Sequence, residues 1–384
     1  MTRTTPLRVI LPALLVALGS ALGGCQGEPA EPPVAEAPHG TLSHALMAWT
    51  TVDPLQQPRS EHAAARLADD TVLVSGGSIG LEIFLTGAER FFLPSHFASA
   101  GNMNIHRGQH TMTLLPDGKA LVTGGYSLMS EDEFLLSTEL YDPGTGAWSF
   151  AAPLSVQRSK HTAVRLLDGR VLVAGGLPGY KPGSMNTAEV YDANNNTWSN
   201  VPPMSANRYD HRAVLLPSGK VLVVGGYGVR SAELYDPVKN TWSSAGSMSV
   251  VRNHCALALL PNGKVLVTGG ETSNQLLSSA ELYDPATNSW SPAAPMQHTR
   301  SMHTLTALSN GYVLAVGGMG TAQTQMEIYL PSANAWRIGP PLQAARYGHT
   351  ATVVNSDKVL VVGGRWFGSG DLSSAELFSL SGTF

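Results

Sequence analysis

The chain has little charge and almost no cysteine. Charged residues make up 14% of its 384 residues, against about a quarter in an average soluble protein. Cys25 and Cys255 are its only cysteines, so a framework of several disulfides is excluded. Lys and Arg number 24 against 28 Asp and Glu, a formal net charge of -4. This lack of a basic excess argues against a nucleic-acid partner.

Glycine and proline, by contrast, are abundant, with 40 and 25 residues. Such an excess indicates many turns and argues against a helical bundle. Hydrophobic residues make up 43% of the chain, which is enough for a large core. Together these properties predict a large, turn-rich, all-β protein that folds without disulfide bonds.

Residues 1–24 have the features of an export signal. Arg3 and Arg8 form a positively charged region before a short apolar run at residues 9–18. The run is shorter than the ~20 residues of a membrane-spanning helix, but it suits the core of a signal peptide. It leads into a Leu-Gly-Gly-Cys sequence that ends at Cys25. This ending resembles bacterial lipoprotein signals, which implies cleavage before Cys25 and a diacylglycerol on its sulfur. An ordinary secretory signal with an incidental cysteine is the alternative.

Residues 25–43 are interpreted as a lipidated cysteine followed by a tether. Residues 26–39 contain four prolines and three glutamates and almost no large apolar side chain, so they cannot bury enough surface to offset their ordering entropy. Gln26 stands after the cysteine, where the lipoprotein resemblance implies the outer membrane. We therefore expect an exported, lipid-anchored protein that faces the periplasm or the cell surface.

The rest of the chain repeats one pattern seven times. A Gly-Gly pair follows an apolar run at intervals of 44 to 51 residues, beginning at Gly76, Gly124, Gly175, Gly225, Gly269, Gly317 and Gly363. An Arg-x-x-His motif precedes six of the pairs, with its histidine 14 residues before the first glycine: His62, His110, His161, His211, His303 and His349. In the fifth copy Cys255 takes the histidine position, and His254 stands one residue earlier.

Further residues keep register with the glycines. Each pair is followed by a glutamate, at Glu89, Glu139, Glu189, Glu233, Glu281, Glu327 and Glu376. Five of these have a tryptophan nine residues later, and four continue as Tyr-Asp two residues later. Each unit predicts four strands, of which the second is apolar on consecutive residues and so buried on both faces. The pattern resembles the kelch repeat, which implies a β-propeller of four-stranded blades.

The ends of the repeat region indicate how the ring closes. The last copy stops after its third strand, near Leu380, whereas an unmatched Trp49 precedes the first copy. We therefore expect residues 44–384 to form a seven-bladed propeller, with the strand around Trp49 completing the last blade. Closure in this way removes exposed sheet edges.

Residues present in every blade are interpreted first as scaffold. The repeated Arg and Glu are expected to pair, and the tryptophans to pack between blades. The histidines are expected to hydrogen-bond between blades. Metal binding is the alternative, although neighbouring blades hold these side chains too far apart to share one ion. Cys255 is either a reactive thiol at the channel mouth or a small buried hydrophobe.

The loops between the second and third strands, here the b–c loops, differ in length and chemistry. They share one face with the Arg-x-x-His corners, and function often lies on loops of a rigid scaffold. Ordinary solvated loops are the alternative. The binding residues predicted on this face are aromatic and cationic: Tyr180, Tyr227, Arg230, Arg365, Trp366 and Phe367.

The preferred functional hypothesis is a non-catalytic, monomeric binding propeller that recognises a protein or glycan through its b–c loops and needs no metal or cofactor. The alternative is a carbohydrate-active enzyme, because some kelch-like propellers are sialic-acid epimerases and others are copper radical oxidases that resemble galactose oxidase. Those oxidases need a Tyr-Cys crosslink and paired histidines. This chain has no adjacent His-His pair and, beyond Cys25, one cysteine.

Overall fold

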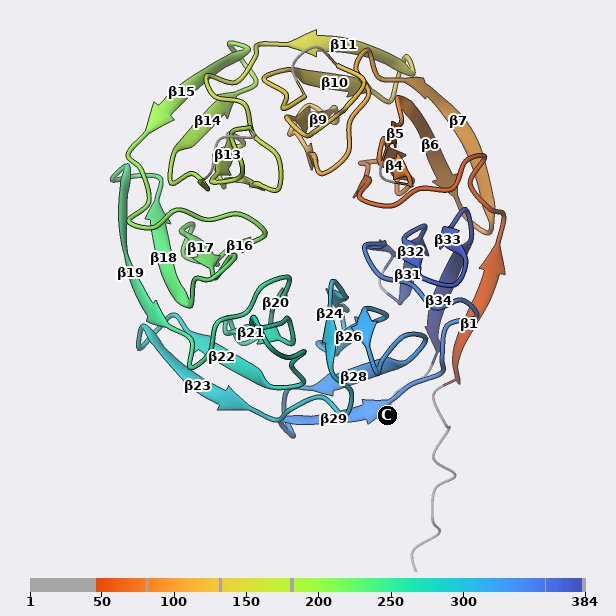
Figure 1. Cartoon of the computed structure of the whole chain (residues 1–384), viewed down its shortest axis with the longest axis vertical. Helices are drawn as coiled ribbons and strands as arrows, with labels where there is room; N and C mark the ends of the chain where they lie inside the picture. The colour runs from red at the N-terminus through yellow and green to blue at the C-terminus, as the bar shows by residue number, and fades with distance from the viewer. Residues whose placement is uncertain (1–45, 81, 131–132, 180–182, 356, 382–384) are drawn as a thin grey trace, which may run out of the picture. The chain divides into compact units, whose positions relative to one another are not determined.

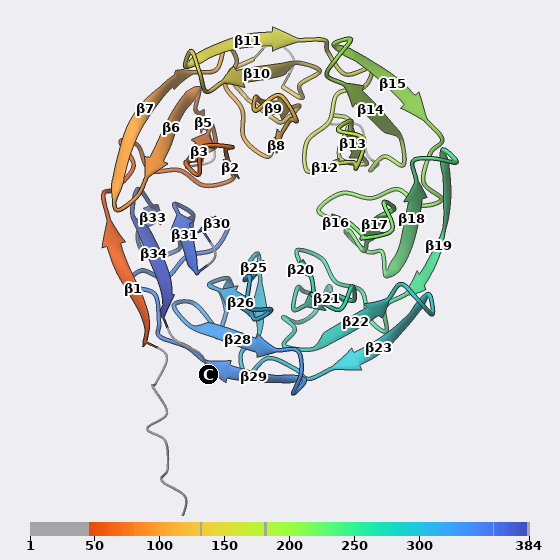
Figure 2. The same ribbon diagram turned by 180° about the vertical axis from the view of Figure 1, so that it is seen from behind.

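The computed structural model describes residues 46–80, 82–130, 133–179, 183–355 and 357–381. In these ranges seven four-stranded antiparallel sheets stand as blades around a central axis (Figures 1 and 2). The propeller unit spans His44–Phe384. No helix among the described residues is long and apolar enough to cross a membrane. The structure confirms the predicted all-β, seven-bladed propeller, whereas Cys25 and the predicted segments 1–24 and 25–43 lie outside the described residues.

Each blade has strands a to d from the axis outward. Blade 1 comprises β2 (Ala63–Arg66), β3 (Val72–Ser75), β6 (Gly87–Phe92) and β7 (His96–Asn102). Blade 2 comprises β8 (Thr111–Leu114), β9 (Ala120–Thr123), β10 (Thr138–Asp142) and β11 (Ala147–Ala151). Blade 3 comprises β12 (Thr162–Arg165), β13 (Val171–Ala174), β14 (Ala188–Asp192) and β15 (Thr197–Val201).

Blades 4 to 6 repeat this order. Blade 4 comprises β16 (Arg212–Leu215), β17 (Val221–Val224), β18 (Ser231–Asp236) and β19 (Thr241–Ser247). Blade 5 comprises β20 (Ala256–Leu259), β21 (Val265–Thr268), β22 (Ala280–Asp284) and β23 (Ser289–Ala293). Blade 6 comprises β25 (Thr304–Ala307), β26 (Val313–Val316), β28 (Met326–Leu330) and β29 (Ala335–Ile338).

Blade 7 closes the ring with strands from both ends of the propeller. Strands β30 (Thr350–Asn355), β31 (Lys358–Val362) and β34 (Ala375–Ser381) supply a, b and c, and β1 (Leu46–Val52) supplies d. Strand β1 runs antiparallel to β34, with Leu46 opposite Ser381 and Val52 opposite Ala375. The b–c loop leads into Ala375, so the described chain enters β1 on the face opposite the b–c loops.

Three short ribbons lie outside the blades. They pair β4 (Ser78–Ile79) with β5 (Ile83–Phe84), β24 (Arg300–Ser301) with β27 (Met319–Gly320), and β32 (Arg365–Trp366) with β33 (Gly370–Asp371). The sequence pattern does not predict them, because each strand is only two residues long and all of them except β24 lie in b–c loops, which differ between repeats. The ribbons β4–β5 and β32–β33 lie within the b–c loops of blades 1 and 7. The ribbon β24–β27 joins the Arg300 corner of blade 6 to the b–c loop of the same blade.

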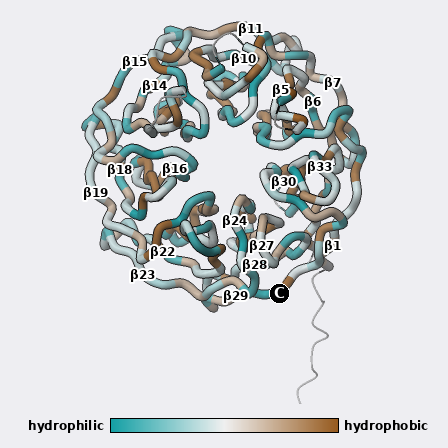
Figure 3. Tube along the Cα trace, viewed as in Figure 1, coloured by the Kyte–Doolittle hydropathy of each residue, from teal (hydrophilic) through white to brown (hydrophobic). Residues whose placement is uncertain are grey.

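The core lies between neighbouring blades. Strand b is wholly buried, as in β13 and β17. A typical cluster joins Leu172 and Val190 of blade 3 to Val221, Val223 and Tyr235 of blade 4, and Figure 3 shows hydrophobic stretches within the blades. Each Trp of strand d also donates from Nε1 to a carbonyl of the preceding blade; for example, Trp198 reaches Ala152 O over 2.8 Å. The tryptophans therefore join the blades, as predicted.

Candidate functional site

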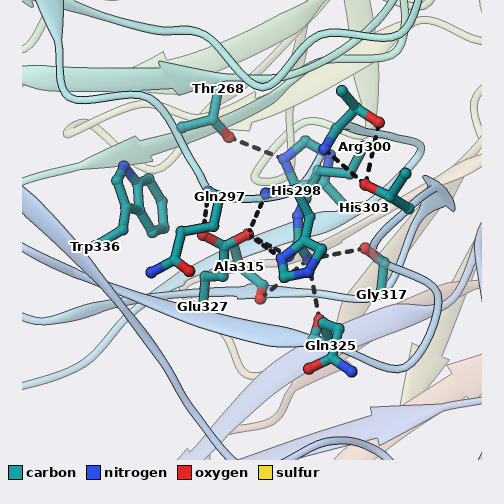
Figure 4. Close-up of polar contacts among 12 residues, drawn as sticks. Thr268, Gln297, His298, Arg300, His303, Ala315, Gly317, Gln325, Glu327 and Trp336 are labelled. Carbon is teal, nitrogen blue, oxygen red and sulfur yellow. Dashed lines mark hydrogen bonds and ion pairs between the residues drawn. The ribbon is translucent and has the colours of Figure 1, made fainter.

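The repeated Arg and Glu fix the loop corners at one end of every blade. In blade 6, Arg300 Nη2 contacts Glu327 Oε1 at 2.8 Å, and its Nη1 donates to Gly317 O over 3.0 Å (Figure 4). The second carboxylate oxygen accepts from the backbone N–H of Gln297 over 2.6 Å. A buried charge is stable only with such partners. The pair therefore locks the d–a crossover against the b–c loop.

The same pair lies within each blade, over 2.7 to 3.0 Å, with both side chains almost fully buried: Arg59–Glu89, Arg107–Glu139, Arg158–Glu189, Arg208–Glu233, Arg252–Glu281, Arg300–Glu327 and Arg346–Glu376. This set is structural. Because it holds the corner segments rigidly, residues next to it can present side chains at fixed positions.

The six repeated histidines are buried and linked to the preceding blade. Nε2 of His62 lies 2.9 Å from Thr350 Oγ1, and that of His211 lies 2.9 Å from Thr162 Oγ1. Burial, followed by the charge of Arg59, lowers the pKa of His62 to about 3. Each ring is therefore neutral and serves as a hydrogen-bonding link between blades. Among the described residues, no group of three or more His, Cys, Asp or Glu side chains could hold a metal ion.

The residues directly before the six histidines, and directly before Cys255 in blade 5, form the mouth of the central channel. All seven have φ between 51° and 61°: Glu61, Gln109, Lys160, Asp210, His254, Met302 and Gly348. Backbone N–H groups of six of them donate to the carbonyl of the preceding member, as from Gln109 to Glu61 over 2.9 Å and from Lys160 to Gln109 over 3.1 Å. Left-handed backbone is costly for non-glycine residues, so this geometry is imposed by the scaffold.

These residues surround a pocket of about 450 Å³ at the axis. One arc of its rim is polar and internally bonded. Gln109 Nε2 donates to Glu61 Oε2 over 3.1 Å, and Lys160 Nζ donates to Asp210 Oδ2 over 3.2 Å. His254 Nε2 lies 3.1 Å from the same Asp210 oxygen. The other arc, at Met302 and Gly348, is apolar or without a side chain, so the pocket offers a polar edge and an apolar wall.

Five of the six predicted binding residues are described by the structure, and they lie on this face but outside the pocket lining. In blade 4, Tyr227 is 57% exposed and stacks on Tyr209 with ring centroids 5.2 Å apart, while Arg230 is exposed nearby along the loop. Tyr180 lies outside the described residues. Tyr209 directly precedes Asp210 of the rim, so this aromatic pair borders the pocket.

A second aromatic group stands on blade 7. Phe367 is 75% exposed, with its ring centroid 5.2 Å from that of Tyr347 and 5.8 Å from that of Trp366. Arg365 pairs with Asp371 over 2.8 Å and also donates to the carbonyl of Gly80 in blade 1. The structure therefore separates the predicted residues into two groups on blades 4 and 7.

Sequence reasoning missed the seven rim residues. The whole Arg-x-x-His corner was interpreted as scaffold. This interpretation is correct for the Arg and the His, but the residue directly before the histidine lines the pocket. The available signal was variation: this position holds Glu, Gln, Lys, Asp, His, Met and Gly, although the Arg two residues before it occurs in every blade and the His after it in six. A position that varies within a repeated, rigid corner is not required for the fold of the blade, and its side chain is therefore a candidate for binding.

Cys255 is a buried hydrophobe. It is free, fully buried, and packed in an apolar cluster with Leu222, Val224 and Met248. Burial raises the pKa of its thiol. A protonated, inaccessible thiol is a poor nucleophile, so of the two readings of Cys255 the structure supports the packing role.

The geometry defines a propeller of kelch-type blades with a polar pocket at one end of its axis. The chain belongs to the kelch-repeat family: residues 160–364 match the family described as the KLHDC2/KLHL20/DRC7 Kelch-repeats domain. A comparison with curated proteins found no match. Among solved structures the chain is similar to a fungal alcohol oxidase of the AA5 family in complex with copper, with a TM-score of 0.70 and 18% identity. The match covers 87% of this chain and 76% of that one, and it shows the fold alone.

The residues of this pocket do not fit a copper centre like that expected of such an oxidase. The histidines that line it are committed through Nε2 to hydroxyls of neighbouring blades, as in His303 to Thr268 over 2.8 Å. Cys255 is buried among apolar side chains, and His254 is held between two carboxylates, at 3.0 and 3.1 Å.

Proposed function

We propose that this protein is a membrane-anchored, non-catalytic propeller that binds its partner on the face carrying the channel mouth and the b–c loops. The observation that carries the proposal is the rim of the pocket. All seven corners contain the Arg and six contain the His, yet the rim position before the histidine holds six different side chains and one glycine around one cavity. A repeated scaffold that holds one ring of varied residues around a pocket is typical of a surface that recognises a ligand.

The pocket and its surroundings favour a glycan over a charged peptide. Its charged groups largely neutralise one another, in Lys160 with Asp210 and in His254 with Glu271. Paired groups of this kind retain hydrogen-bonding capacity but little net charge. The apolar wall at Met302 and the exposed rings of Tyr227 and Phe367 suit the faces of sugar rings. A neutral, hydroxyl-rich ligand fits this mixture best, and a protein partner is the competing outcome.

The entry point of the chain supports the anchored arrangement. Strand β1 begins at Leu46 on the face opposite the b–c loops. A lipid on Cys25 would connect through residues 26–45 to that opposite face.

A glycan array probed with the full-length protein in detergent tests the proposal. Glu61→Ala with Gln109→Ala should abolish binding, because this change removes one of the polar pairs of the rim. The matched control is Leu167→Ser with Val238→Ser, since both side chains are exposed on the opposite face. Loss of binding in the control with retention in the rim variant would place the site on the other face. Binding to a protein extract but to no glycan would favour a protein partner.

A further inference from the structure

The junction between blades 4 and 5 departs from the other six in the backbone. Elsewhere the second glycine of each pair donates to the Arg carbonyl of the next blade, as from Gly176 to Arg208 over 2.7 Å. No such bond joins Gly226 to Arg252 in the described chain. A Cβ placed on Gly225 would lie 3.4 Å from Arg252 O, against 2.3 to 2.6 Å at the equivalent glycines. This junction, here called the seam, is therefore wider than the others.

Two further links are missing at the seam. The ring of N–H to carbonyl bonds around the mouth has no bond from His254 to Asp210 among the described residues. The histidine that links blades elsewhere is replaced by Cys255. Elsewhere the histidine often contacts a Thr of the preceding blade, as His211 contacts Thr162. In blade 4 the equivalent position holds Arg212, whose charge would oppose a protonated imidazole. Three of the regular connections between blades are thus absent at this one place. The tryptophan link remains, from Trp290 Nε1 to Ala245 O over 2.7 Å, and the N–H of Gly228 donates to Asn253 Oδ1 over 2.9 Å.

A chain of side chains spans the same place. Nδ1 of His254 lies 3.0 Å from Glu271 Oε1, and its Nε2 lies 3.1 Å from Asp210 Oδ2. Lys160 of blade 3 contacts Asp210 over 3.2 Å, and Ser301 of blade 6 donates to Glu271 over 3.3 Å. The imidazole is the only member that touches both carboxylates. It therefore connects the corners of blades 4 and 5 where the backbone does not.

We propose that the seam is a pH-sensitive latch at the channel mouth, in which a protonated His254 holds Asp210 to Glu271 and the seam loosens when the ring loses its proton. A protonated imidazole donates from both nitrogens, whereas the neutral ring donates from one. In the neutral ring one nitrogen lone pair then faces a carboxylate, and one of the two contacts becomes repulsive. The latch goes beyond the proposed ligand binding and does not depend on it.

The surrounding charges set the direction of the titration. Burial alone would lower the pKa of His254, but the hydrogen bonds and charges of Asp210 and Glu271 outweigh it and raise that pKa above 6.5. Burial likewise opposes ionisation of Asp210, yet His254, Lys160 and Arg212 hold its pKa at about 2. Lys160 and Arg212 are the cationic side chains that line the same pocket. Asp210 thus remains charged throughout the range in which the ring titrates.

The sign of the effect follows from this shift. The folded pKa of His254 is raised above its unfolded value, so its stabilisation is complete below pH 6.5 and disappears as pH rises through the folded pKa. Loss of the proton should favour opening of the seam by a factor of about ten for each pH unit by which the folded pKa of His254 exceeds its unfolded pKa. At the junction of blades 5 and 6, His298 contacts one carboxylate, that of Glu327. At none of the other six junctions does a described imidazole bridge two carboxylates, so these junctions should lack the latch.

Hydrogen exchange of the full-length protein at pH 5.5, 7 and 8.5 tests the latch. After correction for intrinsic rates, protection of residues 250–256 should fall as pH rises. Protection of residues 344–350, at the junction of blades 6 and 7, should stay constant and serves as the internal control, because its only histidine, His349, is buried with a lowered pKa. In His254→Gln, protection at the seam should be low at all three pH values.

A second variant keeps the test decisive if His254→Gln fails to fold. Glu271→Gln keeps the imidazole but removes one carboxylate, so the loss of protection should occur at lower pH than in the natural protein. Constant protection at the seam of the natural protein would overturn the proposal. An unchanged pH profile in Glu271→Gln would do the same, because the carboxylate would then have no part in holding the proton.

Discussion

Trp49 and Phe378 lie opposite each other in the blade that closes the ring, although 329 positions separate them in the sequence. Strands β1 and β34 pair them in register, and their ring centroids are 5.3 Å apart. Trp49 Nε1 also donates to Pro340 O in blade 6 over 2.9 Å. The first described strand is thus joined both to the last blade and to its neighbour, as the unmatched tryptophan predicted.

Deletion of residues 44–55 should abolish cooperative thermal unfolding. It removes the outer strand of blade 7, exposes the edge of β34, and takes Val52 and Leu55 out of an apolar cluster. The milder Trp49→Ala change should lower stability by about 2 kcal/mol, since this side chain is only half-buried. Calorimetry measures both. A melting temperature unchanged by the deletion would contradict closure by β1.

The buried ion pair of blade 3 should be far more important for stability than an exposed pair in the same blade. Glu189→Ala leaves Arg158 buried without its charge partner and should cost about 3–5 kcal/mol. The matched control is Asp168→Ala, which removes the partner of Arg170 at the surface and should cost less than about 1 kcal/mol. Urea unfolding of both variants measures the difference. Equal losses would show that burial of the Arg158–Glu189 pair is not decisive.

The sequence predicted the fold in detail because the scaffold repeats. Arg158, Glu189 and Trp198 have the same neighbours as their equivalents in other blades, so the pattern could be recognised from spacing alone. The pocket could not be recognised in this way. Its rim residues, such as Lys160 and His254, follow no chemical pattern, and their convergence depends on left-handed corners and on the curvature of the ring. Their contacts with one another join different blades, whereas the repeat pattern describes each blade separately.

Acid should destabilise the protein through its buried histidines. Burial and neighbouring arginines lower the folded pKa of His62 and His211 to about 3, against 6.5 for the unfolded chain. Between these values the unfolded state binds more protons, so stability falls as pH decreases from 6.5 toward 3. Each such histidine should add about 1.4 kcal/mol per pH unit to the slope near pH 5. His62→Gln should reduce that slope by about this amount in urea titrations at several pH values.

The lipid anchor predicted at Cys25 remains a prediction and can be tested separately from the propeller. Cys25→Ser should release the protein from membranes or leave the precursor unprocessed, because a serine hydroxyl does not accept the lipid in place of the thiol. Fractionation and mass spectrometry distinguish these results. The matched control is Cys255→Ser, since that buried thiol lies in the folded core. A processed Cys25→Ser protein that still partitions with membranes would refute the anchor.

The aromatic group on blade 7 allows binding and folding to be separated. Phe367 is largely exposed, so Phe367→Ala should weaken binding to any glycan found on the array while leaving the melting temperature within about 1 °C. Arg365→Ala should instead lower the melting temperature, because it removes the ion pair with Asp371 and the contact with Gly80 of blade 1. The equivalent test on blade 4 is Tyr227→Ala. If both aromatic variants bind normally while the Glu61/Gln109 double variant does not, recognition is confined to the pocket and the b–c loops serve only to frame it.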